Sequence, residues 1–236
     1  MKNILTALRN DLKSNASEER RISGERFFKE PVKMYGMRAS QLSAIAKTHF
    51  IHVKGLSKKE VWELCEQLWK SGLYEEAIVA CIWSCKIKKQ FTPEDFPVFE
   101  KWVTQYITNW AACDTFCNHT MGTFLEMYPD FLKDLKKWTR SGNRWVRRAA
   151  AVSLIVPARK GMWLDDVFEI ATAMLHDTDD MVQKGYGWML KVAANKHEKE
   201  VFDFVCKHKD TMPRTALRYA IEKMPEILKK KAMERE

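Results

Sequence analysis

Two short segments combine residue types that could carry out chemistry. In one, Trp110 and Asp114 are four residues apart, so they share one face of a helix. In the other, Lys184 and Trp188 have the same spacing, and Lys191 follows three residues later. Chemistry at these positions would have to use a carboxylate, aromatic faces and cations. Each residue taken alone also has a structural explanation, with the tryptophans in the core and Asp114 as a helix cap or ion-pair partner.

The sequence lacks the signatures of several enzyme classes. It contains no GxGxxG after a strand pattern, no P-loop, no HExxH and no GxSxG. Its six histidines are scattered, and its six cysteines form no CxxC. Only His119 lies near a cysteine pair, so small buried thiols in a reducing compartment explain the cysteines better than a zinc site. We therefore expect no metal site.

The composition is that of a basic globular chain. Among 236 residues, 40 are Lys or Arg and 31 are Asp or Glu, which gives a formal net charge of +9, and 46% are apolar. That apolar content can build a sizeable core. Nine glycines and seven prolines are too few for a turn-rich β-sandwich or barrel. No apolar run approaches the ~18 residues of a membrane span, and no signal-peptide pattern opens the chain, so we expect a cytoplasmic protein.

Helical periodicity predicts an all-α fold. A capping-box pattern, Ser57 to Glu60, precedes an amphipathic stripe, and Thr92-Pro93-Glu94-Asp95 precedes a second one. The stripes are Val61, Trp62, Cys65, Leu68 and Trp69, then Val98, Phe99, Trp102, Val103, Tyr106 and Ile107. No segment alternates with a period of two over a useful length. The loops are short and none separates domains, so we expect a single domain over residues 1–236.

Similar segments recur about every 36 to 40 residues, which predicts an α-solenoid of HEAT-like antiparallel helix pairs. The recurring segments are Leu73–Ala80, Asn143–Val152, Asp180–Trp188 and Pro213–Ala220. The inner helices of such a fold line a concave groove, which here would carry Arg144, Arg147, Arg148, Lys184, Lys191, Arg214 and Arg218. A basic groove favours a polyanion such as duplex nucleic acid, although a solvated helix face explains these cations equally well. Equivalent repeat positions would bring together Trp110, Asp114, Arg148 and Trp188.

Four segments in the same order resemble the AlkD-type DNA alkylation-repair glycosylases, which are built from HEAT-like repeats. They are Arg26–Arg38, Asn109–Asp114, Trp145–Ala150 and Val182–Trp188. The resemblance covers nearly the whole chain. One departure is Phe27, at a position where relatives often have tyrosine.

The resemblance implies a monofunctional glycosylase that removes cationic N3- or N7-alkylated purines from double-stranded DNA. It implies no deep base flipping, no metal and no organic cofactor. Asp114 would stabilise positive charge on the deoxyribose and hold the attacking water, and Trp110 and Trp188 would pack on the sugar. Arg148 would clamp a backbone phosphate, and the further phosphate contacts would be Arg147, Lys184, Lys191 and Arg144. We expect a monomer in the cytoplasm, associated with the nucleoid when it acts on DNA.

Two other functions remain open. The same scaffold could bind damaged or structured DNA without catalysis, or it could be a protein–protein scaffold. The glycosylase is favoured because an aspartate in a phosphate-binding groove weakens DNA binding by charge repulsion, so its presence there indicates chemistry.

Overall fold

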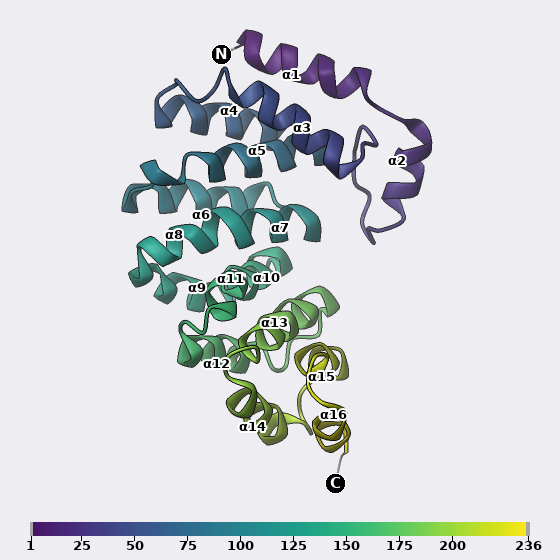
Figure 1. The fold of residues 1–236 in the computed structure, drawn as a ribbon, viewed down its shortest axis with the longest axis vertical. Coiled ribbons are helices and arrows are strands. Elements are labelled where there is room, and N and C mark those ends of the chain that lie inside the picture. Colours follow the sequence, from purple (N-terminus) through teal and green to yellow (C-terminus); the bar gives the residue numbers. More distant parts are fainter. Residues whose placement is uncertain (1, 235–236) are drawn as a thin grey trace. The chain divides into compact units, whose positions relative to one another are not determined.

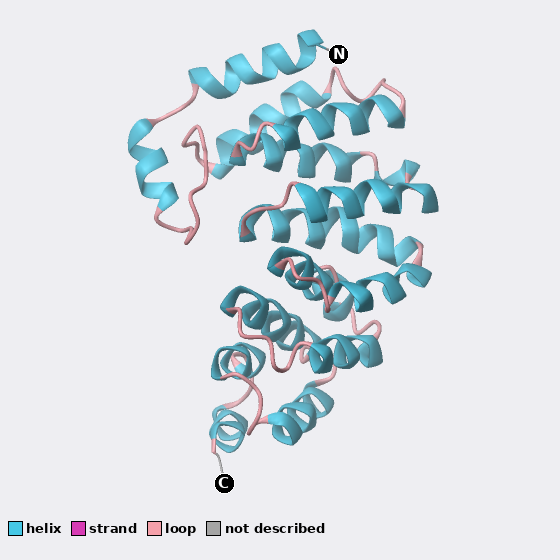
Figure 2. Ribbon diagram, turned by 180° about the vertical axis from the view of Figure 1, so that it is seen from behind, coloured by secondary structure: helices cyan, strands magenta, loops and turns pink. Residues whose placement is uncertain are grey.

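The computed structural model describes residues 2–234 and confirms the all-α prediction. These residues form helices joined by loops, with one isolated bridge between Lys33 and Leu73 (Figure 2). No helix among them combines the length and the apolar character needed to cross a bilayer. Contacts divide the chain into two compact units, Met1–Phe116 and Cys117–Glu236. The single domain over 1–236 stays a prediction.

In the first unit, the odd-numbered helices pack against one another in chain order and form one row. Contacts join α1 to α3, α3 to α5 and α5 to α7, and α4 covers α5 (Figure 1). This alternation is the packing expected of a helical solenoid. The helices are α1 (Lys2–Ser14), α2 (Glu18–Glu25), α3 (Ala39–Phe50), α4 (Lys58–Lys70), α5 (Tyr74–Lys86), α6 (Phe96–Gln105) and α7 (Trp110–Phe116).

Local sequence explains where α4 and α6 begin. Ser57 and Glu60 form the predicted capping box at the start of α4, which satisfies backbone N–H groups that have no helical partner. Before α6, Pro93–Asp95 forms a 3₁₀ turn, and Asp95 accepts hydrogen bonds from the backbone N–H of Thr92 at 2.8 Å and the Trp62 indole at 2.9 Å. The predicted cap therefore also ties the start of α6 to the face of α4.

The core of the first unit is aromatic. All five residues of the predicted α4 stripe are buried, and Trp62 meets Trp102 edge-on at 5.6 Å between ring centroids. Phe116, in α7, packs in the same way against Trp102 at 5.8 Å. Because α7 is anchored in this cluster by its last residue, the orientation of its first turn is fixed by the core.

The second unit contains a further row of helices, α10, α13 and α15, in contact in that order. Figure 1 shows α13 and α15 side by side. The rest of the unit is a π-helical turn at Cys117–Met121 and further helices, several of which pack against this row. The helices are α8 (Gly122–Met127), α9 (Leu132–Trp138), α10 (Arg144–Val152), α11 (Ile155–Arg159), α12 (Leu164–Ala173), α13 (Asp180–Ala193), α14 (Glu198–His208), α15 (Arg214–Ile221) and α16 (Glu226–Met233).

Two glycines bring the helices of this row close together. A Cβ on Gly187 would lie 2.7 Å from both the Ala216 carbonyl oxygen and the Tyr219 Cβ, so the close approach of α13 to α15 at this point requires glycine. A Cβ on Gly185 would lie 3.2 Å from the Arg148 Cγ, on the side of α10. Small residues in the recurring segments therefore set the spacing of the row.

Candidate functional site

The predicted tryptophan and aspartate lie on the first turns of α7. The side chain of Asn109 accepts a hydrogen bond from the backbone N–H of Ala112 at 2.9 Å, which makes Asn109 the cap of this helix. Trp110 is then the first helical residue and Asp114 lies one turn later. Both side chains are half-buried, whereas the residues between them, Ala111 to Cys113, are buried. The helix thus presents Trp110 and Asp114 on its more open face.

An aromatic stack and one hydrogen bond hold the Trp110 ring. Its indole N–H donates to the Phe27 carbonyl at 3.2 Å, and the ring stacks on Phe28 with centroids 5.6 Å apart and an interplanar angle of 26°. Phe28 in turn meets Tyr74 edge-on at 5.8 Å. Phe27 itself is 74% exposed. Phe28 lies within the Arg26–Arg38 segment that carries the family resemblance, but no spacing in the sequence links it to Trp110.

A cavity of about 210 Å³ lies beside this stack. Its lining combines aromatic, thioether and charged groups, namely Arg20, Gly24, Phe27, Phe28, Met34, Gly36, Met37, Tyr74, Glu75, Trp110 and Ala111. The site around Trp110 is therefore built by α7, by the first turn of α5 and by the segment that follows α2.

Two consecutive buried carboxylates at the start of α5 fasten that segment. Glu75 and Glu76 are each 1% exposed. Glu75 accepts hydrogen bonds from the successive backbone N–H groups of Tyr35 at 2.9 Å, Gly36 at 2.8 Å and Met37 at 3.3 Å. Charge-assisted bonds of this kind are about twice as strong as neutral ones. Glu75 therefore fixes the backbone of the segment that reaches Trp110.

Glu76 joins the same segment to α1. Its carboxylate accepts two bonds at 3.1 Å from Arg9 Nε, one at 2.9 Å from Arg9 Nη2, and one at 2.9 Å from the Tyr35 hydroxyl. Burial and this bond to Glu76 raise the pKa of the Tyr35 phenol, so Tyr35 stays protonated and acts as a donor. The first turn of α5 thus holds both α1 and the 35–37 segment.

Arg148 lies on α10, which is capped by Asn143 through a 2.9 Å bond from the Trp145 N–H. The arginine is 5% exposed, and its guanidinium donates to the main-chain carbonyl of Met181 at the start of α13. Gly185, one turn along α13, leaves room for the arginine stem. Arg148 is therefore packed between two neighbouring helices of the second unit.

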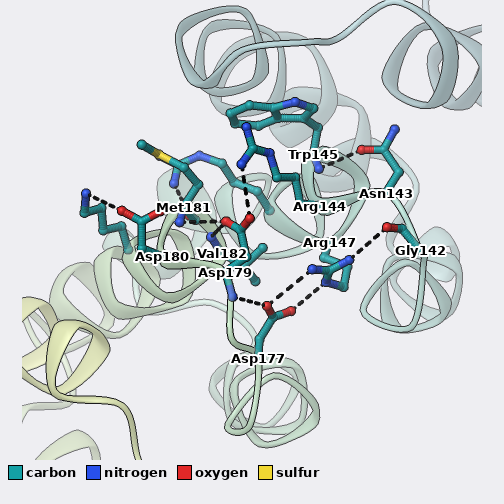
Figure 3. A network of polar contacts seen from close by, with 12 residues as sticks. Gly142, Asn143, Arg144, Trp145, Arg147, Asp177, Asp179, Asp180, Met181 and Val182 are labelled. Atoms are coloured by element: carbon teal, nitrogen blue, oxygen red, sulfur yellow. Dashed lines mark hydrogen bonds and ion pairs between the residues drawn. The ribbon is translucent and has the colours of Figure 1, made fainter. Parts of the chain in front are cut away.

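Three aspartates, two just before α13 and one at its first residue, pair with the neighbouring cations (Figure 3). Asp177 accepts Arg147 Nε at 2.6 Å and Nη2 at 3.3 Å, and Arg147 also donates to the Ser141 carbonyl at 2.8 Å. Asp179 caps α13 through the Met181 N–H at 2.8 Å and also accepts Arg144 Nη1 at 3.2 Å. These acid partners lie 30 residues from Arg147 and 35 residues from Arg144, so helical spacing could not predict them.

The remaining predicted residues lie along α13. Lys184 pairs with Asp180 one turn earlier at 3.1 Å. The side chain of Lys191 is only 13% exposed, since its ammonium pairs with Glu222 at 2.9 Å and lies 5.4 Å from the centre of the Tyr219 ring. Trp188, between them, is half-buried.

The structure thus brings Trp110 and Asp114 together on α7, and it gathers Arg144, Arg147, Arg148 and Lys184 on α10 and α13. That Trp110 and Asp114 line the same concave groove as Arg148 and Trp188 stays a prediction, as do the roles of all these residues. Among residues 2–234, no group of three or more His, Cys, Asp or Glu side chains is arranged to hold a metal ion.

Comparison with known proteins relates this chain to a protein family by its sequence and to a solved structure by its fold. The model of the family described as DNA alkylation repair enzyme matches residues 8–224. A solved structure described as a predicted DNA alkylation repair enzyme from Enterococcus faecalis superposes with a TM-score of 0.80, over 90% of this chain and 98% of that one. Its sequence identity is 17%, so this likeness concerns the fold. No curated protein matches the chain.

Proposed function

The chain belongs to the DNA alkylation repair enzyme family, and we propose that its activity is hydrolysis of the N-glycosidic bond of alkylated purines in duplex DNA. The substrates of this monofunctional glycosylase are bases made cationic by alkylation at N3 or N7. A cationic purine leaves as a neutral base, so the reaction needs no general acid to protonate it. No deep flipping of the base is required.

Asp114 is the residue proposed to act on the reacting atoms. As the glycosidic bond stretches, its electron pair moves onto the base and positive charge develops on the deoxyribose. A carboxylate nearby stabilises that charge and orients the attacking water, whose proton it accepts as the new C–O bond forms. The products are the free neutral base and an abasic site. The observation that carries this proposal is the position of Asp114 one turn after Trp110, on the more open face of α7.

The two tryptophans are proposed to face the sugar. A tryptophan face attracts positive charge, and the attraction strengthens as water is excluded. Trp110 suits this role because its ring is held by Phe28 on one side and by the Phe27 carbonyl at its edge, so little freedom remains to be lost on binding. Trp188 would be the second such face.

The backbone of the duplex is proposed to meet the cations of α10 and α13. Arg148 would clamp a phosphate near the lesion, and Arg144, Arg147, Lys184 and Lys191 would be further contacts. All four of these further contacts are engaged by carboxylates of their own unit, so their phosphate contacts would compete with internal ion pairs.

The test is base release from duplex DNA that carries a single N7-methylguanine. Wild type is expected to release the base above the spontaneous rate, and Asp114→Asn is expected to lose this activity while it keeps duplex binding. Asp203→Asn is a matched control, because it removes the same charge from an exposed pair with Lys199 on α14. Background release by wild type, with duplex binding retained, would instead indicate a non-catalytic DNA-binding protein.

A further inference from the structure

The helices α7, α10, α13 and α15 share a register that can be counted from their caps. The residue before the first helical residue is Asn143 in α10, Asp179 in α13 and Pro213 in α15. Five residues after these positions stand Arg148, Lys184 and Arg218, respectively. Counting from Asn109 in α7 gives Asp114 at the same place. The row α10, α13 and α15 therefore carries a cation at this position on each helix.

The first two cations of this register are already engaged inside the second unit. Arg148 is buried and donates to the Met181 carbonyl, and Lys184 is paired with Asp180. The same holds one turn earlier on α15, because Arg214 donates to the Met233 carbonyl at 3.1 Å, at the end of α16. These groups cannot meet a phosphate without changing an existing interaction.

Arg218 differs from the other two. It is exposed, and within residues 2–234 no carboxylate or carbonyl accepts a hydrogen bond from it. The nearest acid along the helix is Glu222, one turn later, where an i,i+4 pair could form. That carboxylate is engaged by Lys191 at 2.9 Å. Lys191 therefore occupies the acid that would otherwise neutralise Arg218.

We propose that Arg218 is a further phosphate-binding residue of the α10–α13–α15 row, and that it contacts the backbone of duplex DNA without first giving up an internal interaction. This inference rests on the proposed function. A cation with an acid partner brings a carboxylate next to the phosphate, so part of the attraction is cancelled by repulsion. A solvated arginine gives its full charge to the phosphate, and its planar guanidinium can bind two phosphate oxygens.

Salt dependence of binding separates Arg218 from the paired cations. Each neutralised phosphate contributes about 0.9 to the slope of log K against log salt concentration for duplex DNA. This slope is negative, because binding weakens as salt is added. We expect Arg218→Ala to make it shallower by about 0.9 on an unmodified duplex, and Arg218→Lys to restore most of the steepness. Arg147 is also one of the proposed phosphate contacts, but its contact competes with the bidentate pair to Asp177, so Arg147→Ala is expected to reduce the steepness by less than Arg218→Ala.

Arg159→Ala is the matched control for net charge. Arg159 is exposed, has no partner among the described residues and lies in the same unit on α11, outside the row. Equal slope losses for Arg159→Ala and Arg218→Ala would overturn the proposal, as would a loss for Arg147→Ala as large as that for Arg218→Ala. Thermal unfolding of each variant checks that the fold is retained, and the Arg218→Lys variant distinguishes loss of charge from loss of packing.

The experiment distinguishes this inference from the proposed function. Base release by wild type, together with an unchanged slope for Arg218→Ala, would leave the glycosylase standing and remove Arg218 from its DNA-binding surface. A shallower slope without base release would support Arg218 and refute the glycosylase.

Discussion

Among the glycines of the first unit, Gly36 leaves the least room for a side chain. Its φ is +81°, a conformation that L side chains rarely adopt. A Cβ built on it would lie 2.3 Å from the Ser17 carbonyl oxygen and 2.5 Å from the Arg21 nitrogen. Both contacts are to backbone atoms of α2 and its cap, which cannot rotate away. Gly36→Ala therefore forces the 35–37 segment away from α2.

Two costs determine the size of the effect. A left-handed conformation costs an alanine about 1–2 kcal/mol, and an extra methyl group forced into a packed site costs about 1–3 kcal/mol. We expect Gly36→Ala to lower the free energy of unfolding by about 2–5 kcal/mol. Gly72→Ala isolates the first cost, because Gly72 has a φ of +68° and no atom within 4 Å of the built Cβ. Gly55→Ala carries neither cost, since its φ is not in this range and its Cβ meets open space.

Urea unfolding followed by circular dichroism measures the three variants. The expected order of stability is Gly55→Ala, then Gly72→Ala, then Gly36→Ala. Base release should also fall most in Gly36→Ala, because the displaced 35–37 segment is bonded to Glu75 and belongs to the same loop as Phe28, which stacks on Trp110. If Gly36→Ala and Gly72→Ala differ by less than about 0.5 kcal/mol, within the usual range of surface substitutions, then the close approach to α2 carries no energy and the reasoning is wrong.

Two further predictions concern other parts of the chain. Alanine at either Gly185 or Gly187 gains about 1 kcal/mol of helix propensity. Only Gly187→Ala places its methyl group 2.7 Å from the Ala216 carbonyl, so this variant should be less stable than Gly185→Ala by at least ~1 kcal/mol in urea unfolding. Equal stabilities of the two variants would contradict the packing of α13 on α15. Lys101 and Lys70 lower the pKa of Glu66 from 4.5 to about 2. Stability from this carboxylate is therefore present above pH 4.5 and is lost as the pH falls toward 2, by about 1 kcal/mol or less because both lysine partners are exposed to solvent. Unfolding curves between pH 2 and 6 should show this loss in wild type and a smaller one in Glu66→Gln, and identical pH profiles would refute the assignment.

Local features of the fold could be predicted from the sequence because they depend on neighbouring residues. The capping box at Ser57 and Glu60, the cap at Thr92 and Asp95, and the buried α4 stripe all involve residues within about two turns of one another. The recurring segments fall on α5, α10, α13 and α15, which take part in the rows of packed helices. The pair Trp110 and Asp114 was found in the same way, from a spacing of four within one helix.

Partners far apart in the sequence were decided only by the tertiary structure. Phe28 reaches Trp110 across 82 positions, and the Arg147–Asp177 and Lys191–Glu222 pairs join residues 30 and 31 positions apart. Composition and spacing show that these charges and rings exist, but which of them meet depends on how helices pack against each other. The sequence therefore determined an all-α fold, the caps before α4 and α6, a basic chain, and an aspartate one helical turn after a tryptophan. Packing decided which cations are neutralised from within, and left Arg218 exposed, because the acid one turn away from it is bound by a lysine of another helix.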